Sequence, residues 1–469
     1  MMNVRIALEL ALLLTAQLGA EPTALPTALP PASAPAPTPA PRPSGLGLAD
    51  LERIAFDNNP TLAQSIKRFE QSRGRAMQAG AYPNPLLAWT GSSLGDQGTA
   101  GTQEGFFQQP IVTGGKIRVN RSRYEVDVEM ARLSIFEQQM LIRNGVRLRY
   151  LQILALQSLL DLQTGLVRTA RGVVETTRRK VDSGHASDPD LLMAENEAAE
   201  LALDLEQLQQ RRQGVWREVA AYLGCPGMAP GRLDGTLGGP IPDLTWDAAL
   251  ERLLRDSPEI RMAELQIQRQ QLTLKREQIE PIPDLVVRGG AAYMPTSNQT
   301  VGYLRLYVEF PIWDRNKGNI HTAENGLSET RQDLDRIRLD LQRRLSRAYN
   351  HHQTSVTNVR RYNDEILPRA RRAFELYLKS FRDEDASYSR VQSSQSMFAQ
   401  ASVKYLKELL ELRRAQVAID GLLLVEESIE PGTLRPEGEG ALSPPGRGVP
   451  HQAAGGGVPV GRPSRNEAP

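Results

Sequence analysis

The chain has almost no cysteine and no excess of charge of either sign, and each shortage excludes a class of protein. Cys225 is the single cysteine among 469 residues, so neither an internal disulfide nor a CxxC-type metal site can form. We expect it to be a small buried residue near a helix end. Lys and Arg number 56 against 55 Asp and Glu, which argues against nucleic acid as a general partner.

Aromatic residues and long apolar runs are also scarce. Aromatic residues make up 5% of the chain, and the dominance of Leu, Ala, Gln, Arg and Glu is typical of long helices. No run of about 20 apolar residues follows the N-terminus, so we expect no membrane-spanning helix in the mature chain. No nucleophile elbow, Walker-type phosphate loop or HExxH sequence occurs, and we expect no catalytic residues, no enzyme activity and no cofactor.

The N-terminal residues have the pattern of a secretory signal. Arg5 precedes a mostly apolar stretch over 6–18, and the small residue Ala20 suits cleavage after it. No cysteine follows to carry a lipid anchor. We therefore expect export, with 1–20 as a signal peptide.

The rest of the sequence is a duplication. Four landmarks recur at offsets of 198, 198, 201 and 199 residues: Pro60 and Pro258, Pro83 and Pro281, Pro110 and Pro311, Gly184 and Asp383. A nearly constant offset indicates two tandem copies of one unit. The predicted domains are a Pro/Ala-rich disordered linker (21–46), a first copy (47–229), a second copy (230–424) and a disordered Pro/Gly-rich tail (425–469).

Each copy is predicted to contain the same elements. A short helix ends before an Asn-Pro or Ser-Pro pair, because proline suits the first turn of the helix that follows. The second helix ends at Pro-x-Pro, and two extended stretches and a pair of long helices come next. The short helices are expected at 48–57, 60–79, 247–256 and 258–279, and the extended stretches at 86–93, 103–109, 285–294 and 301–310.

The predicted long helices are longer than an ordinary globular domain requires. Residues 116–181 contain no proline, and their apolar residues recur mostly at coiled-coil spacing. At 1.5 Å per residue, roughly 65 residues span on the order of 100 Å. Asp188 is predicted to cap the partner helix, with Pro189 in its first turn. Each copy therefore ends in an antiparallel helical hairpin.

The extended stretches alternate between apolar and polar residues, most clearly over 301–310. One face would carry Leu304, Leu306, Val308 and Phe310, and the other Tyr303, Arg305, Tyr307 and Glu309. This pattern is typical of membrane β-barrel strands, although a small soluble sheet that caps a helical bundle would also show it. Candidate interfacial aromatics are Trp89, Phe106, Phe107, Tyr293 and Tyr303. Four strands do not close a barrel, whereas three chains supply twelve, so barrel and trimer form one hypothesis.

Two motifs at equivalent positions of the copies resemble the strand-to-helix junctions of the TolC-type outer-membrane efflux protein family. The first is Phe107-Gln108-Gln109-Pro110-Ile111 with Gly114-Gly115-Lys116. The second runs from Phe310-Pro311 through Asp314-Arg315-Asn316-Lys317-Gly318, a form similar to the heavy-metal cation efflux (CzcC-like) branch. The resemblance covers about 47–424.

This resemblance implies a mainly α fold with a membrane β-barrel. Three copies of the duplicated chain, with four β-strands each, would form a twelve-strand barrel and an α-helical tunnel of long coiled-coil hairpins. The homotrimer would lie in the lipid outer membrane, extend into the periplasm and meet a periplasmic adaptor (membrane fusion protein) and an inner-membrane RND-type pump. It would be a passive duct, for heavy-metal cations in this branch. The alternatives are a multidrug or type I protein secretion duct of the same fold, or a soluble coiled-coil scaffold.

The hairpin tips are the predicted adaptor contacts. Gly184 suits a tight helix reversal, and Ser187 or Asp188 can cap the next helix. The resemblance implies docking at Gly184, Ser187, Ala386 and Ser387. A turn without contacts remains the alternative.

The second tip carries Asp383, Glu384 and Asp385 in succession. Three chains would bring about nine carboxylates together as a periplasmic gate, which could bind Arg or Lys across subunits and favour cations. A solvated acidic loop is the alternative. Adjacent histidines on a helix point about 100° apart, so His351-His352 is predicted to be a surface pair and not a metal site.

Overall fold

The computed structural model describes residues 45–95, 98, 100–295, 297–383 and 387–425. The chain divides into the units Met1–Val425 and Glu426–Pro469, and every described residue belongs to the first. The predicted signal peptide, the linker up to residue 44 and the tail from residue 426 lie outside the described residues. Leu46, placed in the predicted linker, instead pairs with Leu233 through a parallel β-bridge.

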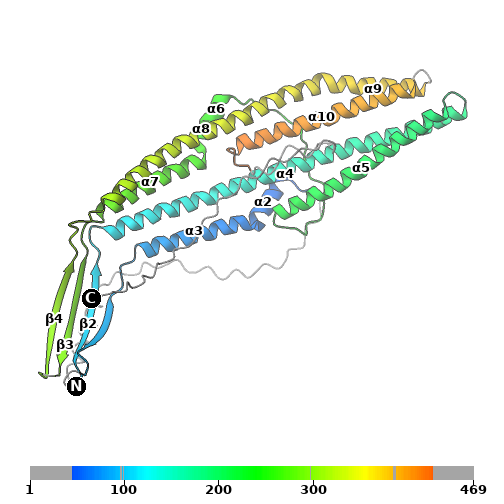
Figure 1. Ribbon diagram of the computed structural model, residues 1–469. Helices are drawn as coiled ribbons and strands as arrows, with labels where there is room; N and C mark the ends of the chain where they lie inside the picture. The colour runs from blue at the N-terminus through cyan, green and yellow to red at the C-terminus, as the bar shows by residue number, and fades with distance from the viewer. Residues whose placement is uncertain (1–44, 96–97, 99, 296, 384–386, 426–469) are drawn as a thin grey trace, which may run out of the picture. The chain divides into compact units, whose positions relative to one another are not determined.

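The same order of elements occurs twice (Figure 1). The first set comprises α2 (Leu48–Asn58), α3 (Pro60–Ala79), β1 (Leu86–Ser92), β2 (Thr102–Ile111), α4 (Lys116–Asp182) and α5 (Asp188–Tyr222). The second comprises α6 (Trp246–Asp256), α7 (Pro258–Ile279), β3 (Leu285–Met294), β4 (Gln299–Val308), α8 (Lys317–Arg361), the π-helical turn η2 (Tyr362–Ile366), α9 (Leu367–Arg382) and α10 (Tyr388–Asp420).

The proline signals locate the short helices correctly. Asn59 precedes α3 and its side chain accepts a hydrogen bond from the Thr61 N–H at 3.0 Å, while Pro60 occupies the first turn. Ser257 and Pro258 stand at the same point before α7. The predicted ranges of these helices are confirmed to within a residue at each end.

A proline also explains why the two long helices differ. α4 continues for 67 residues without a break. In the second copy, Pro368 lies in the first turn of α9, directly after η2. Proline has no N–H and its ring crowds the preceding turn, and a π-helical turn relieves that crowding without ending the helix.

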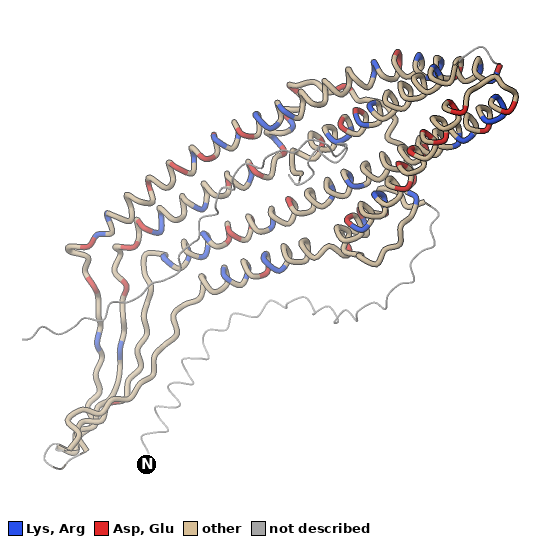
Figure 2. The backbone as a smooth tube through the Cα atoms, turned by 45° about the vertical axis from the view of Figure 1, so that its right-hand side comes forward, with Lys and Arg blue, Asp and Glu red and all other residues tan. Residues whose placement is uncertain are grey.

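The four strands form one antiparallel sheet in the order β1-β2-β3-β4. The sheet lies beyond one end of the helices, and the α4–α5 and α9–α10 tips lie at the opposite end (Figure 1). α4 packs against α3, α5, α7 and α10, so it joins the two copies. Acidic and basic residues are spread along the helices and are few on the sheet (Figure 2).

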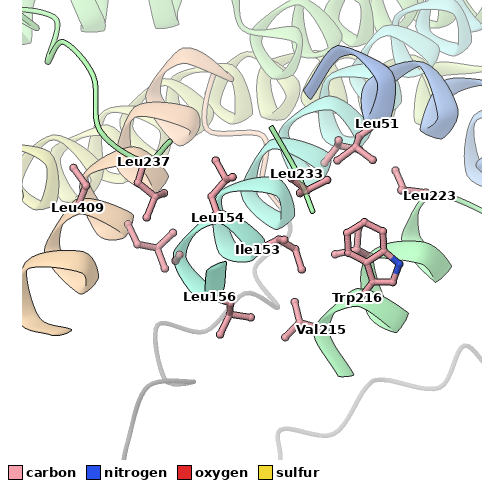
Figure 3. Close-up of a cluster of buried hydrophobic side chains, with 14 of the residues drawn as sticks. Leu51, Ile153, Leu154, Leu156, Val215, Trp216, Leu223, Leu233, Leu237 and Leu409 are labelled. Carbon is pink, nitrogen blue, oxygen red and sulfur yellow. The ribbon is translucent and has the colours of Figure 1, made fainter. Parts of the chain in front are cut away.

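The largest apolar core surrounds the middle of α4. Ile153 and Leu154 of α4 meet Trp216 of α5, Leu51 of α2 and Leu409 of α10 (Figure 3). Leu233 and Leu237, from the connection between the copies, complete it. The core therefore fixes both hairpins to one helix and holds them in register.

Buried amides fasten the same region. Gln157 of α4 exchanges two hydrogen bonds with the backbone of Leu233, at 3.0 and 3.2 Å. Asn144, 1% exposed, donates to the carbonyls of Gly421 and Leu424 just after α10. The bonds to Leu233 and Leu424 satisfy backbone groups that would otherwise be buried without partners, while the Gly421 carbonyl also accepts from the Leu424 N–H at 3.1 Å.

Candidate functional site: a two-faced sheet, two junctions and two hairpin tips

One face of the sheet is apolar and exposed. The strand register places Leu87, Phe107, Gly289 and Leu304 in one row across β1 to β4. Leu87 is 81% exposed, and Leu304 and Leu306 are 70% and 62% exposed. Contiguous apolar surface of this kind marks contact with lipid or with another protein. β2, β3 and β4 each have 10 residues, the length that crosses a bilayer as a tilted strand.

The opposite face is polar and carries every charged residue of the four strands: Glu104, Arg288 and Arg305. Arg288 Nη2 donates to Glu104 Oε1 at 2.7 Å, and its guanidinium lies 3.4 Å from the ring centroid of Phe106. The Tyr303 hydroxyl donates to the same carboxylate oxygen. Glu104 is therefore held by two donors.

This register corrects two predictions. Phe106 and Tyr303 lie on the polar face, so they are not interfacial aromatics, whereas Trp89, Phe107 and Tyr293 share the apolar face. β4 also ends at Val308, so Glu309 and Phe310 follow the strand and do not extend its alternation. The face on which a residue lies depends on the strand register. Alternation with a period of two does not fix the face where two adjacent residues, such as Phe106 and Phe107, are both aromatic.

The first junction lies between β2 and α4. Pro110 pairs with Val286 near the end of β2, and Gly115 precedes α4 with φ +70°, a conformation that a side chain disfavours. Lys116 is 5% exposed, and its Nζ lies 3.2 Å from Asp284 Oδ2. The Thr113 N–H donates to Asp284 Oδ1 at 2.8 Å. A buried cation and a backbone bond thus fasten this junction to the start of β3.

The second junction, between β4 and α8, uses different chemistry at equivalent positions. Asn316 takes the left-handed conformation of Gly115, with φ +57°, and its N–H donates to Asp314 Oδ1 at 2.9 Å. Its side-chain amide donates to both the carbonyl and the carboxylate of Glu277, at 2.9 and 2.8 Å. Asparagine tolerates this conformation better than most residues, and here it also binds the end of α7.

Four other residues of the junction motifs do not fasten the junctions. Pro311 follows β4, and Arg315 is exposed. A methyl group on Gly318 would meet no atom within 4 Å, so local packing does not require glycine there. Lys317 is exposed, unlike its counterpart Lys116.

The first hairpin tip is a tight reversal. Gly184 has φ +76°, as predicted, and the N–H groups of Gly184 and His185 donate to the carbonyls of Val181 and Lys180. Ser187 caps α5 through a capping box with Asp190, its hydroxyl bonding Asp190 Oδ2 at 2.7 Å. The predicted cap at Asp188 is wrong, because Asp188 is already the first helical residue. The Asp190 side chain, three residues further along, completes the capping box and so favours Ser187 as the cap.

The second tip joins α9 to α10. Asp383 follows α9 and is exposed, and its N–H donates to the carbonyl of Lys379 at 3.0 Å. Ser387 stands at the N-cap of α10. Glu384, Asp385 and Ala386 lie outside the described residues.

The two tips are joined by a buried lysine. Lys180 of α4 is 8% exposed, its Nζ donates to the Phe381 carbonyl at 2.5 Å, and it lies 4.3 Å from the Phe381 ring centroid. Phe381, Tyr388 and Val391 pack with Val173 in an apolar cluster. Burial, followed by the nearby acids Glu197 and Asp190, raises the pKa of Tyr388 to about 12, so its hydroxyl stays neutral.

A basic pocket of about 340 Å³ opens beside this lysine. It is lined by Thr176, Arg179, Lys180, Ser183 and Arg382. Arg382, the α9 residue in this lining, directly precedes Asp383 in the chain. The pocket has the charge that would bind a carboxylate.

Residues 52–225 and 249–423 match the outer membrane efflux protein family. The chain belongs to this family. The efflux protein is thus an outer-membrane channel protein of Gram-negative type. The sheet with one apolar face and the long hairpins are the parts of the chain that this assignment explains.

Similarity to a curated protein supports the heavy-metal branch. The efflux protein is 26% identical over 376 residues to the cobalt-zinc-cadmium resistance protein CzcC of Cupriavidus metallidurans, covering 79% of this chain and 88% of that protein.

Solved channels share the fold at low sequence identity. The outer membrane protein VceC of Vibrio cholerae is 15% identical with a TM-score of 0.66, covering 80% of this chain and 96% of that one. CusC is 13% identical with a TM-score of 0.66, over 80% and 91%. The MtrE outer membrane channel of Neisseria gonorrhoeae is 14% identical with a TM-score of 0.62, over 81% and 89%.

Sequence reasoning missed the partners that hold these sites. Lys180 was not singled out, and neither was the pair of Glu104 and Arg288. Asp284 had a usable signal, because it replaces Leu86 at the equivalent position of the first copy. A carboxylate at a position that is otherwise apolar suggests a specific partner, here Lys116.

Within the described ranges, no helix of the efflux protein is long and apolar enough to cross a membrane. No group of three or more His, Cys, Asp or Glu side chains in this part of the chain could hold a metal ion. Cys225 lies just after α5 and is half-buried.

The histidine pair is not a surface pair. His351 is exposed, but His352 is 1% exposed on α8, and its two ring nitrogens have no hydrogen-bond partner among the described residues. Burial lowers the pKa of His352, against a smaller opposing effect of Asp420. Asp420 itself pairs with Arg252 of α6 at 3.2 Å. His352 is therefore a neutral core residue.

We expect His352 to make the efflux protein less stable in mild acid. Because its pKa is lower in the folded state, the unfolded chain binds the proton first as pH falls below about 6.5. Stability should fall between about pH 7 and 5, and His352→Leu should flatten this dependence in thermal unfolding followed by circular dichroism. The exposed His351→Leu is the control; an equal flattening there would contradict the assignment.

Proposed function

We propose that the efflux protein is a passive export duct that works as a homotrimer. The observation that carries the proposal is the sheet, which has one exposed apolar face, one polar face and two open edges at β1 and β4. Open edges cannot face lipid, because their backbone groups would lack partners. Pairing of β4 with β1 of the next copy would close twelve strands around a polar lumen.

Membrane fractionation followed by gel mobility tests the proposal. We expect the protein in the outer-membrane fraction, with an SDS-resistant trimer in unheated samples that becomes a monomer on heating. A soluble protein with the same mobility before and after heating would instead indicate a helical scaffold with a small sheet.

The hairpin tips are the proposed docking site for a periplasmic adaptor, which would connect the duct to an inner-membrane RND-type pump. Gly184, Ser187 and Ser387 lie at these tips, and Lys180 holds the two hairpins together there. The pump supplies the energy for transport in this proposal.

Heavy-metal cations are the proposed cargo, on the similarity to CzcC. A host that lacks the gene should accumulate more cobalt, zinc or cadmium than the parent when the other components of the system are present. Unchanged metal content together with greater drug sensitivity would favour the multidrug alternative.

Asp383 is the described part of the proposed periplasmic gate. In a closed trimer it would reach the basic pocket of a neighbouring copy, where Arg179 and Arg382 are available. Exposed ion pairs contribute little individually, so Asp383→Ala should raise the ratio of open to closed channels by about tenfold over three copies. Single-channel recording in planar bilayers measures this ratio.

Asp204→Ala removes the same charge from an exposed position on α5, away from the tip, and should leave the ratio unchanged. Arg382→Gln should open the channel as Asp383→Ala does. If neither tip variant changes opening, the acids form a solvated loop.

A further inference from the structure

The polar face of the sheet has an uneven charge. Its three charged residues are two arginines and one glutamate, and the strands carry no other charge. Glu104 accepts bonds from Arg288 and from Tyr303, so one arginine is already neutralised. Each chain therefore contributes one uncompensated positive charge to this face.

That charge belongs to Arg305. Its side chain is exposed and its guanidinium lies 4.6 Å from the ring centroid of Tyr303, while no carboxylate in the described part of the chain forms an ion pair with it. Arg305 stands directly opposite Arg288 in the register. Like charges at such positions destabilise a sheet. Arg288 avoids Arg305 by extending over Phe106 to Glu104.

We propose that Arg305 sets the ion selectivity of the barrel lumen. This inference depends on the proposed trimeric duct, in which three copies of Arg305 would lie at one level and create a positive ring. The ring favours anions, including anionic complexes, and opposes the return of free cations from the medium. In a duct for metal cations the ring would oppose free cations in both directions, so net export would depend on delivery by the pump.

Reversal potentials across planar bilayers measure the effect, with the purified full-length protein in a KCl gradient. Arg305→Gln should lower the ratio of chloride to potassium permeability by roughly two- to five-fold, because three exposed charges act through water and salt. Glu104→Gln should raise the ratio, since it leaves Arg288 without a counter-charge. Arg305→Lys keeps the charge and should keep the wild-type ratio.

Arg255→Gln is the matched control. It removes an arginine from α6, where Arg255 is 66% exposed and pairs with its neighbour Asp256, so the ratio should not change. Each variant is first checked for an SDS-resistant trimer. Opposite shifts in Arg305→Gln and Glu104→Gln would support the proposal.

Failure of the selectivity role can be distinguished from failure of the duct. A conducting trimer whose permeability ratio is the same in wild type, Arg305→Gln and Glu104→Gln would overturn the selectivity role and leave the duct intact. Shifts in the same direction for both variants would overturn it too, because they would indicate distortion of the sheet and not charge. A wild-type protein without a trimer or conductance would overturn the duct itself and the inference with it.

Discussion

Replacing Trp216 with alanine should lower the free energy of unfolding of the helical part by roughly 3–5 kcal/mol. Trp216 is 2% exposed, packs among apolar residues of α2, α4 and α5, and donates its indole N–H to the Met228 carbonyl at 3.1 Å. The substitution leaves a cavity at the point where the first hairpin is fixed to α4, and it removes the donor to the carbonyl of the half-buried Met228. Both effects act in the same direction.

Urea or thermal unfolding of the detergent-solubilised protein, followed by helical circular dichroism, measures this loss. Trp313→Ala is the matched control, because Trp313 follows β4 and is 92% exposed. It should leave the helical transition unchanged. Equal destabilisation by the two variants would show that the core around Trp216 does not limit stability.

Asn144→Leu should lower the free energy of unfolding by about 1–3 kcal/mol, although leucine has the same branched shape and number of heavy atoms as asparagine. No cavity forms, and the loss comes mainly from the Leu424 carbonyl, which stays buried after losing its bond of 2.7 Å. The Gly421 carbonyl loses a bond of 3.0 Å but still accepts from the Leu424 N–H at 3.1 Å. These bonds hold the end of α10 against α4. The variant should therefore loosen the second hairpin and expose the end of α10 to protease.

Limited proteolysis together with the unfolding transition measures this effect. Asn325→Leu is the control: Asn325 is also on a long helix, but it is exposed and bonds only within its own turn, to His321. A stable Asn144→Leu protein, with no new cleavage near residue 421, would mean that water replaces the lost donor.

Prolines and glycines made much of the fold predictable. The helices α3 and α7 begin at Pro60 and Pro258, and α4 and α8 begin at Lys116 and Lys317. These residues act on the backbone of their own turn, so their effect does not depend on what the chain later packs against. The constant offset between the copies extended each local prediction to a second site.

It was harder to predict from the sequence which side chains are buried and which residues contact one another. His352 was expected at the surface because adjacent histidines on a helix point in different directions and form no metal site, yet it faces the helical core. Phe106 was expected at a lipid interface, yet it lies beneath Arg288. Both errors concern which side of an element meets a distant segment. The amphipathic pattern near each residue did not distinguish the two sides.

The duplication, the hairpins, the four strands and the family follow from the amino-acid sequence alone, because repeats, turn residues and periodicity are properties of neighbouring residues. Three contacts depend on how distant segments pack: Lys180 joins the two tips, Asp284 binds Lys116, and Glu104 neutralises Arg288. These partners are about 170 to 200 residues apart in the chain. Their contact depends on the register in which two copies pack, and the packing of α4 against both copies sets that register.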